Sequence, residues 1–247
     1  MNTKFEEQKL KQGFGFVIGC DEVGRGSLAG PVVAAAVVFR MPTANDELKV
    51  HQVYKVIKSE TKDSKQLSPK KREELASFIK QNFLWAIGEV SHKTIDKINI
   101  HNASLLAMRR AVENLSMCHC ECSRSNPKTR DCHALRCIRS RNDKLFLVID
   151  GKFTIPSVVH SRQTLRAGPK FDMEQEAVVK GDNKIFSIAA ASIVAKVYRD
   201  ELMRKLNKKY SQYGFAQHKG YGTLHHRNMV KQHGLSPLHR KSFCLPR

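Results

Sequence analysis

Acidic residues are missing from the C-terminal part of this chain. Residues 202–247 contain no Asp or Glu, whereas they contain ten Lys or Arg and five His. The whole chain has 43 Lys and Arg against 23 Asp and Glu, which gives a formal net charge of +20 at pH 7. So one-sided a charge is typical of proteins that bind a polyanion, because neutralised phosphates release counterions. We expect nucleic acid as the partner.

Long apolar runs are also missing. No segment approaches the roughly 20 apolar residues that a membrane-spanning helix needs. Residues 1–12 are polar and lack the apolar core of a secretory signal, and no basic segment carries a continuous apolar helical face. We therefore expect no membrane contact and a cytoplasmic location. The seven cysteines are an odd number, and we expect Cys20 and Cys244 to be reduced thiols, with Cys20 a small core residue.

The familiar signatures of nucleophilic, nucleotide-binding and zinc-dependent catalysis are absent as well. There is no Gly-x-Ser-x-Gly elbow, no Walker loop and no paired zinc-type His motif. The candidate chemistry therefore rests on carboxylates. Asp21 and Glu22 directly follow an apolar run, and two adjacent acids stay charged only where a cation offsets their repulsion. Oxygen ligands suit Mg²⁺ or Mn²⁺, although an exposed Asp-Glu pair that opens a hairpin is the simpler alternative.

Two further acids follow apolar segments. Asp150 ends the run 145–149 and is followed by Gly151, which leaves room beside it. Asp182 lies between Gly181 and the start of a helix, where it could instead cap the helix at Ile185. Four carboxylates can hold two divalent ions about 4 Å apart, which is an arrangement that supports in-line hydrolysis of a phosphodiester.

The apolar pattern predicts an α/β protein. Strands are expected over 14–20, 31–39, 83–90, 145–149 and 176–179, since these runs are rich in Val, Ile and Phe. Helices are expected over about 69–82, 101–115 and 185–210, and Ser68-Pro69 supplies a start signal for the first. Strands that come first and then alternate with helices indicate a mixed sheet with helices on its faces.

Several blocks of the sequence together resemble one family. They are Asp21-Glu22-Val23-Gly24-Arg25-Gly26, Asp63-Ser64-Lys65, Val148-Ile149-Asp150-Gly151, Lys180-Gly181-Asp182 with the helix behind it, Gly214 to Tyr221, and Arg240-Lys241-Ser242-Phe243. In this order they resemble the motifs of ribonuclease HII, the bacterial type 2 ribonuclease H. The resemblance covers residues 15–243. It implies the ribonuclease H-like fold, with a mixed sheet flanked by helices and a small C-terminal helical subdomain.

The resemblance also implies roles for individual residues. The catalytic and metal-binding acids would be Asp21, Glu22, Asp150 and Asp182, with two Mn²⁺ or Mg²⁺ ions present when substrate is bound. The backbone of Gly24, Arg25 and Gly26 would recognise a ribose 2′-hydroxyl, and Tyr221 would stack on the next deoxyribose. The alternative for Gly24-Arg25-Gly26 is a tight hairpin turn without a ligand, and the alternative for Tyr221 is a surface aromatic without a role. The expected phosphate-binding residues are Ser64, Lys65 and Lys219.

The implied activity is hydrolysis of RNA in RNA–DNA hybrids. The enzyme would also nick duplex DNA on the 5′ side of a single embedded ribonucleotide and leave 3′-hydroxyl and 5′-phosphate ends. We expect a monomer, and residues 242–247 offer no clear peptide for binding a sliding clamp. The related ribonuclease HIII typically has Gly-Lys-Gly and an extra N-terminal domain. A non-catalytic basic nucleic-acid-binding protein is a further alternative, although four acids would repel phosphate.

The expected organisation is a catalytic domain over 14–205 and a small basic substrate-binding subdomain over 206–247. A Cys-rich insert over 116–144 departs from the family pattern. Its five Cys and two His could bind zinc, but they lack paired Cys-x-x-Cys spacing, so we expect a basic loop that catalysis does not need. The segment between Asp150 and Asp182 is longer than the family pattern, with an excursion over 162–176.

Overall fold

The structure is a computed structural model that describes residues 3–40, 68–117, 144–156 and 173–243. Residues 118–143 of the insert over 116–144, the loop residues Ser64 and Lys65, most of the excursion over 162–176, and Cys244 therefore lie outside the described residues. The helices and strands are α1 (Lys4–Lys11), β1 (Phe14–Val23), β2 (Val32–Phe39), α3 (Pro69–Asn82), β3 (Trp85–Val90), α4 (His92–Met117), β4 (Lys144–Asp150), β5 (Glu174–Val178), η3 (Gly181–Asn183), α7 (Phe186–Lys209), η4 (Ser211–Tyr213), α8 (Phe215–His218) and α9 (Leu224–His233).

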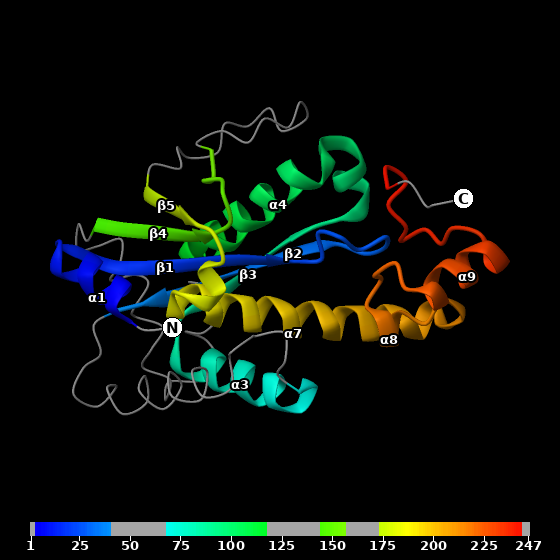
Figure 1. The fold of residues 1–247 in the computed structure, drawn as a ribbon, viewed down its shortest axis with the longest axis horizontal. Helices are drawn as coiled ribbons and strands as arrows, with labels where there is room; N and C mark the ends of the chain where they lie inside the picture. The colour runs from blue at the N-terminus through cyan, green and yellow to red at the C-terminus, as the bar shows by residue number, and fades with distance from the viewer. Residues whose placement is uncertain (1–2, 41–67, 118–143, 157–172, 244–247) are drawn as a thin grey trace.

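The strands form one mixed sheet with the order β3-β2-β1-β4-β5. β1 pairs antiparallel with β2 and parallel with β4, while β2 pairs antiparallel with β3 and β4 parallel with β5. Figure 1 shows α4 on one face of this sheet, with α7 and α3 on the other. The predicted α/β architecture is confirmed.

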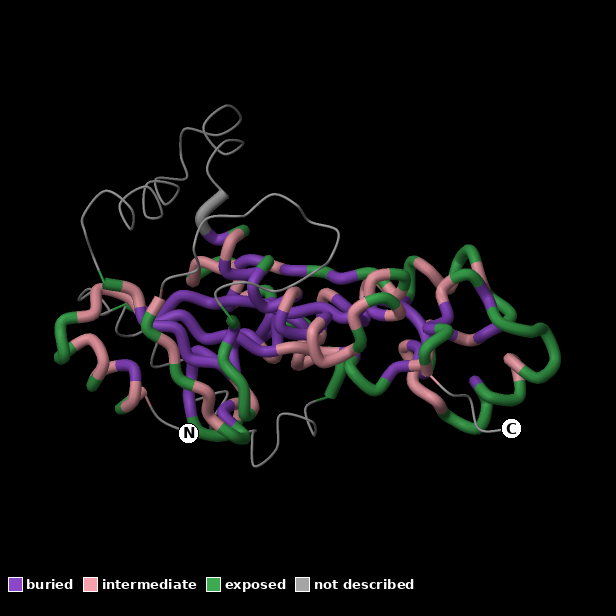
Figure 2. The backbone as a smooth tube through the Cα atoms, turned by 90° about the horizontal axis from the view of Figure 1, so that it is seen from above, coloured by how far each residue is buried: buried purple, intermediate pink, exposed green. Residues whose placement is uncertain are grey.

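The central strands are apolar along their length because both faces of the sheet are covered. Val17 and Val37 belong to the core beneath α3 and α7, whereas Ile18 and Ala36 belong to the core beneath α4. Cys20 also lies in the second core and is fully buried, as predicted. Figure 2 shows this buried centre as a continuous purple band along the sheet.

The start of α7 lies directly on β1. Gly19 makes this approach possible, because a side chain there would overlap the backbone of Ser187. The N-cap residue Ile185 offers no side-chain hydrogen bond, and Glu6 from α1 takes that place. Its Oε1 atom accepts a hydrogen bond from the Ser187 N–H (2.8 Å). The N-terminal helix thus helps to fix the end of α7 that lies nearest the predicted acids.

The acid-free C-terminal segment packs around the far end of α7 (Figure 1). Tyr213 and Phe215 form a small separate core with Met203 and Ala29. The predicted boundary at residue 206 falls inside α7, which runs continuously from Phe186 to Lys209. The division into two domains stays a prediction.

The predicted helix over 101–115 was too short. α4 begins at His92, where the Ser91 side chain accepts a hydrogen bond from the Thr94 N–H (3.3 Å). Asn99 then interrupts the helix with φ 65° and ψ 167°, and its Oδ1 accepts from the Asn102 N–H (3.0 Å) to restart it. Within the described parts of the chain, no helix combines the length and the apolarity needed to cross a membrane.

Candidate active site

Four carboxylates from three parts of the chain line one cleft of about 520 Å³. β1 and β4 run parallel with Cys20 opposite Ile149, so Asp21 and Asp150 follow at the same edge of the sheet. Asp150 Oδ1 accepts a hydrogen bond from the Gly181 N–H (2.7 Å), which holds the η3 turn and its Asp182 beside β4. Together with Glu22 they are the four acids that the sequence predicted.

Asp182 is not the cap of α7. It lies within η3, and the N-cap position of α7 belongs to Ile185. The alternative interpretation of Asp182 as a helix cap is therefore wrong. The acid is half-buried and faces the cleft that the other three line.

The cleft disfavours negative charge in the absence of a cation. Burial, and then repulsion from Glu22 and Asp150, hold the pKa of Asp21 well above its usual range. Burial also raises the pKa of Glu22, although the nearby Arg25 guanidinium lowers it (Nη1–Oε1 3.0 Å). The pKa of Asp150 is raised by burial too, against the opposing hydrogen bond from Gly181. The group is electrostatically incomplete, and a cation would stabilise its ionised form.

The donor set fits divalent metal ions. Glu22 Oε2 is buried and has no hydrogen-bond partner among the described residues, which leaves its lone pairs available to a ligand. No group of three or more His, Cys, Asp or Glu side chains in the described segments converges closely enough to enclose an ion alone. Mg²⁺ is usually held by one or two carboxylates, with water and substrate phosphate completing its shell. Asp21, Glu22, Asp150 and Asp182 suit ions that bind together with substrate.

The predicted Gly24-Arg25-Gly26 segment forms another wall of the cleft. Tyr221 lines the cleft beside it, and an isolated backbone bridge joins Tyr221 to Ser27, just after the segment. The Tyr221 ring is 5.5 Å from the Arg199 guanidinium. Residues that the sequence separates by nearly 200 positions thus face the same space as the acids.

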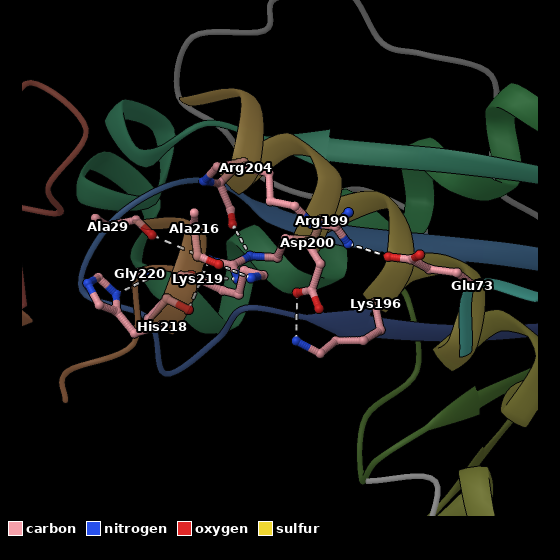
Figure 3. Close-up of polar contacts among 12 residues, drawn as sticks. Ala29, Glu73, Lys196, Arg199, Asp200, Arg204, Ala216, His218, Lys219 and Gly220 are labelled. Carbon is pink, nitrogen blue, oxygen red and sulfur yellow. Dashed lines mark hydrogen bonds and ion pairs between the residues drawn. The ribbon is translucent and has the colours of Figure 1, made fainter. Parts of the chain in front are cut away.

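Arg72, Ser192 and Lys196 also line the cleft, and the sequence analysis gave them no role. Lys196 Nζ is 2.6 Å from Asp200 Oδ1, one turn along α7. Figure 3 shows this pair next to the ion pair of Arg204 with Glu73 of α3. The spacing of Ser192 and Lys196, four residues apart on one helix, is the signal that could have placed them on one face.

Lys219 does not lie where a direct phosphate contact was expected. It is not among the residues that line the cleft, and its ammonium group donates to the Ala216 carbonyl (Figure 3). Burial lowers its pKa. Its own carbonyl accepts a hydrogen bond from Arg199 Nη1 (2.9 Å). A phosphate contact by Lys219 stays a prediction.

The chain matches the family model of ribonuclease HII over residues 18–123 and 146–245. It is 40% identical to ribonuclease HII of Chlorobium chlorochromatii, over 99% of this chain and 97% of that protein. Ribonuclease HII of Borrelia recurrentis is 39% identical over 93% of this chain and 99% of that protein.

Solved structures agree with this result. The ribonuclease HII of Archaeoglobus fulgidus, solved in a complex with PCNA, is 25% identical with a TM-score of 0.57, and the match covers 94% of this chain and 96% of that chain. A ribonuclease HIII solved with Mn²⁺ shares the fold at 18% identity, with a TM-score of 0.56 and coverage of 91% and 65%. The chain therefore belongs to the ribonuclease HII family of metal-dependent endoribonucleases, which have ribonuclease H activity on RNA–DNA.

Proposed function

We propose that this enzyme nicks duplex DNA on the 5′ side of a single embedded ribonucleotide, in addition to hydrolysing the RNA strand of hybrids. The observation that carries the proposal is the meeting of four acids, the Gly24-Arg25-Gly26 backbone and Tyr221 in one cleft. The acids account for hydrolysis, and the other two elements account for selection of a ribose followed by a deoxyribose.

In this proposal Asp21, Glu22, Asp150 and Asp182 hold two divalent ions, Mn²⁺ or Mg²⁺, with the scissile phosphate. When bound, such ions would supply activation of the attacking water and stabilisation of the leaving oxygen. The Gly181 N–H holds the Asp150 carboxylate in place at the wall of the cleft. Departure of the 3′ oxygen leaves a 3′-hydroxyl and a 5′-phosphate.

The wall formed by Gly24-Arg25-Gly26 and Tyr221 supplies selectivity. The Gly24-Arg25-Gly26 backbone donates to or accepts from the 2′-hydroxyl, which only a ribose carries. Tyr221 packs on the following sugar, where a deoxyribose fits most closely. Lys196 and Arg72 line the cleft and attract the phosphates on either side of the scissile phosphate.

A labelled duplex with one ribonucleotide tests this function. In Mn²⁺ we expect one nick on the 5′ side of the ribonucleotide, with a 3′ end that a DNA polymerase extends and a 5′ end that ligase joins. The same duplex without the ribonucleotide serves as the control and should remain intact. A nick on the 3′ side, or cleavage of long hybrids alone, would contradict the proposal.

A further inference from the structure

The C-terminal segment contributes a buried arginine to the ribose-facing wall of the cleft. Arg240 is 2% exposed, and none of the described carboxylates lies within ion-pair distance of it. Its guanidinium instead donates to three carbonyl oxygens: Nη2 to Gly24 (2.7 Å), Nη1 to Arg25 (2.9 Å) and Nε to Gly30 (3.0 Å). The planar, rigid arrangement of these donors fixes the positions of the acceptors relative to one another.

These bonds determine where the neighbouring N–H groups point. The described chain has no cis peptide bonds, and in a planar trans peptide the C=O and N–H groups point in opposite directions. With the carbonyls of Gly24 and Arg25 turned toward Arg240, the N–H groups of Arg25 and Gly26 are directed away from it. Both residues line the cleft, and neither N–H has an acceptor among the described residues. Two unpaired N–H donors are thus held side by side. The charged Arg240 guanidinium, which binds the carbonyl of each of these two peptides, also polarises their N–H groups.

The position of Arg240 is itself fixed from both sides. Its backbone N–H donates to the Leu28 carbonyl (2.9 Å). On the other side, Asp96 of α4 accepts hydrogen bonds from the Lys241 N–H (3.0 Å), the Ser242 N–H (2.8 Å) and the Ser242 hydroxyl (2.6 Å). Another buried guanidinium, that of Arg199, fixes the next part of the same loop through the Pro31 carbonyl (3.1 Å) and the Ser27 hydroxyl (2.9 Å).

We propose that Arg240 is a positioning residue for ribose recognition. Its guanidinium aims the Arg25 and Gly26 N–H groups at the 2′-hydroxyl, and Asp96 keeps the segment that carries Arg240 in register. This inference rests on the proposed function, since it assumes that the Gly24-Arg25-Gly26 backbone is the part that distinguishes ribose from deoxyribose. It assigns selectivity to a residue more than 200 positions away that does not itself contact substrate.

The test compares the affinities of two duplexes that differ by one 2′-hydroxyl. Binding is measured with Ca²⁺ in place of Mn²⁺, and a denaturing gel confirms that the duplex is intact. We expect Arg240→Lys to reduce the preference for the ribonucleotide duplex by about tenfold, because a single ammonium group cannot hold two carbonyls in a fixed plane. Affinity for the all-DNA duplex should change less than twofold, since the charge is kept.

Arg110→Lys is the matched control. Arg110 is exposed on α4 and donates to the Glu89 carbonyl (2.7 Å), so the same change there also removes an arginine–carbonyl bond. Its preference should equal that of the wild-type protein. Asp96→Ala provides a second test. It keeps the Arg240 side chain but removes the acceptor that holds Lys241 and Ser242. It should reduce the preference for the ribonucleotide duplex about threefold to fivefold.

The outcomes separate the inference from the function beneath it. If the wild-type protein binds the two duplexes equally, the ribose-recognition part of the proposed function fails. If the wild-type protein prefers the ribonucleotide and a folded Arg240→Lys protein keeps that preference, or loses affinity equally for both duplexes, the role of Arg240 is overturned. If Arg240→Lys does not fold, Asp96→Ala decides, and an unchanged preference there overturns the inference.

Discussion

Gly24 lies directly against the guanidinium of Arg199. A methyl group on Gly24 would overlap Nε of Arg199, and the glycine also has φ 93°, a backbone conformation that other residues rarely adopt. Gly26, two residues along the same wall, has neither restriction. Nothing in the described structure lies within 4 Å of the position that its Cβ would take. The two glycines are therefore needed for different reasons.

Gly24→Ala should lower stability, while Gly26→Ala should lower activity. We expect Gly24→Ala to cost about 1–3 kcal/mol through strain and overlap, and each kcal/mol corresponds to about 2–4 °C in Tm. Gly26→Ala should keep the wild-type Tm but lose at least about tenfold in cleavage, because the methyl group occupies space that a closely approaching ribose needs. Thermal unfolding and nicking rates test both. A fully active Gly26→Ala protein would show that the ribose does not approach this backbone.

Asp21→Asn and Asp150→Asn should abolish cleavage with little loss of duplex binding. The acids hold the ions, whereas Lys and Arg side chains hold phosphates, and binding should weaken steeply with salt. Asp182→Asn should be severe as well. Glu73→Gln, whose carboxylate pairs with Arg204 outside the cleft, is the control and should keep full activity.

Chelation offers an independent check on the acids. EDTA should stop cleavage by the wild-type enzyme, and added Mn²⁺ or Mg²⁺ should restore it. The Asn variants should stay inactive over the same titration. Normal cleavage by purified Asp21→Asn or Asp150→Asn would mean that the ions are held elsewhere.

The acids could be predicted because local sequence places them. Asp21 and Asp150 each follow an apolar run near the end of a strand, and parallel pairing of adjacent strands brings such ends together at one edge. The Arg199 and Arg240 contacts could not be predicted in this way. Apart from the Ser27 hydroxyl, their hydrogen-bond acceptors are backbone carbonyls up to 216 residues away in the sequence, and a carbonyl has no residue type that a pattern could reveal.

Two differences in the helices have different causes. The first turns of α4 contain Ile95 and Ile98, but the break at Asn99 separates them from the apolar repeat of the rest of the helix, so periodicity placed its start too late. α1 is a short polar helix, and its contribution comes from Glu6, a buried carboxylate whose bond to Ser187 spans 181 residues. The role of Glu6 depends on this tertiary contact, which a local pattern does not contain.

Tyr221→Ala should affect single ribonucleotides more than long hybrids. The ring is half-buried, faces the cleft and lies over Arg199, so it is held in one orientation for a sugar to pack against. Its loss should reduce nicking at a single ribonucleotide about 5- to 150-fold, which corresponds to a stacking contact of about 1–3 kcal/mol. A long hybrid offers alternative registers and should lose less. Tyr221→Phe keeps the ring and should restore the rate, whereas equal losses on both substrates would assign junction sensing to another residue.

A chain of neutral histidines supports the backbone of Tyr221. His226 Nδ1 is 2.9 Å from the Tyr221 carbonyl, which can only accept, so this nitrogen carries the proton. His226 Nε2 then accepts from His239 Nε2 (3.0 Å), and His239 Nδ1 accepts from the Ser236 N–H (2.9 Å). His218 stacks on His226 with 4.2 Å between ring centroids. The last two bonds require uncharged rings, because a protonated His226 Nε2 or His239 Nδ1 could not accept them.

Acid should therefore destabilise the C-terminal core through His226. Burial comes first among the causes that lower its pKa to about 4 from an ordinary value near 6.5, and His218, His239 and His225 add repulsion. A histidine whose pKa is lower in the folded state than in the unfolded state contributes its full stabilisation above pH 6.5. This stabilisation is lost as the pH falls toward 4. His226→Gln cannot titrate, so its Tm should be lower at pH 7 but should fall less between pH 7 and pH 5.

The informative quantity is the difference in unfolding free energy between the wild-type protein and His226→Gln, followed as a function of pH. Asp21 has a raised pKa, so its contribution to stability changes with pH in the opposite direction and could hide the histidine effect in the wild-type curve alone. Because both proteins contain Asp21, its contribution cancels in the difference. We expect the gap in unfolding free energy to narrow by on the order of 1–2 kcal/mol between pH 7 and pH 5. A constant gap for His226→Gln would show that the buried histidines accept protons without loss of structure.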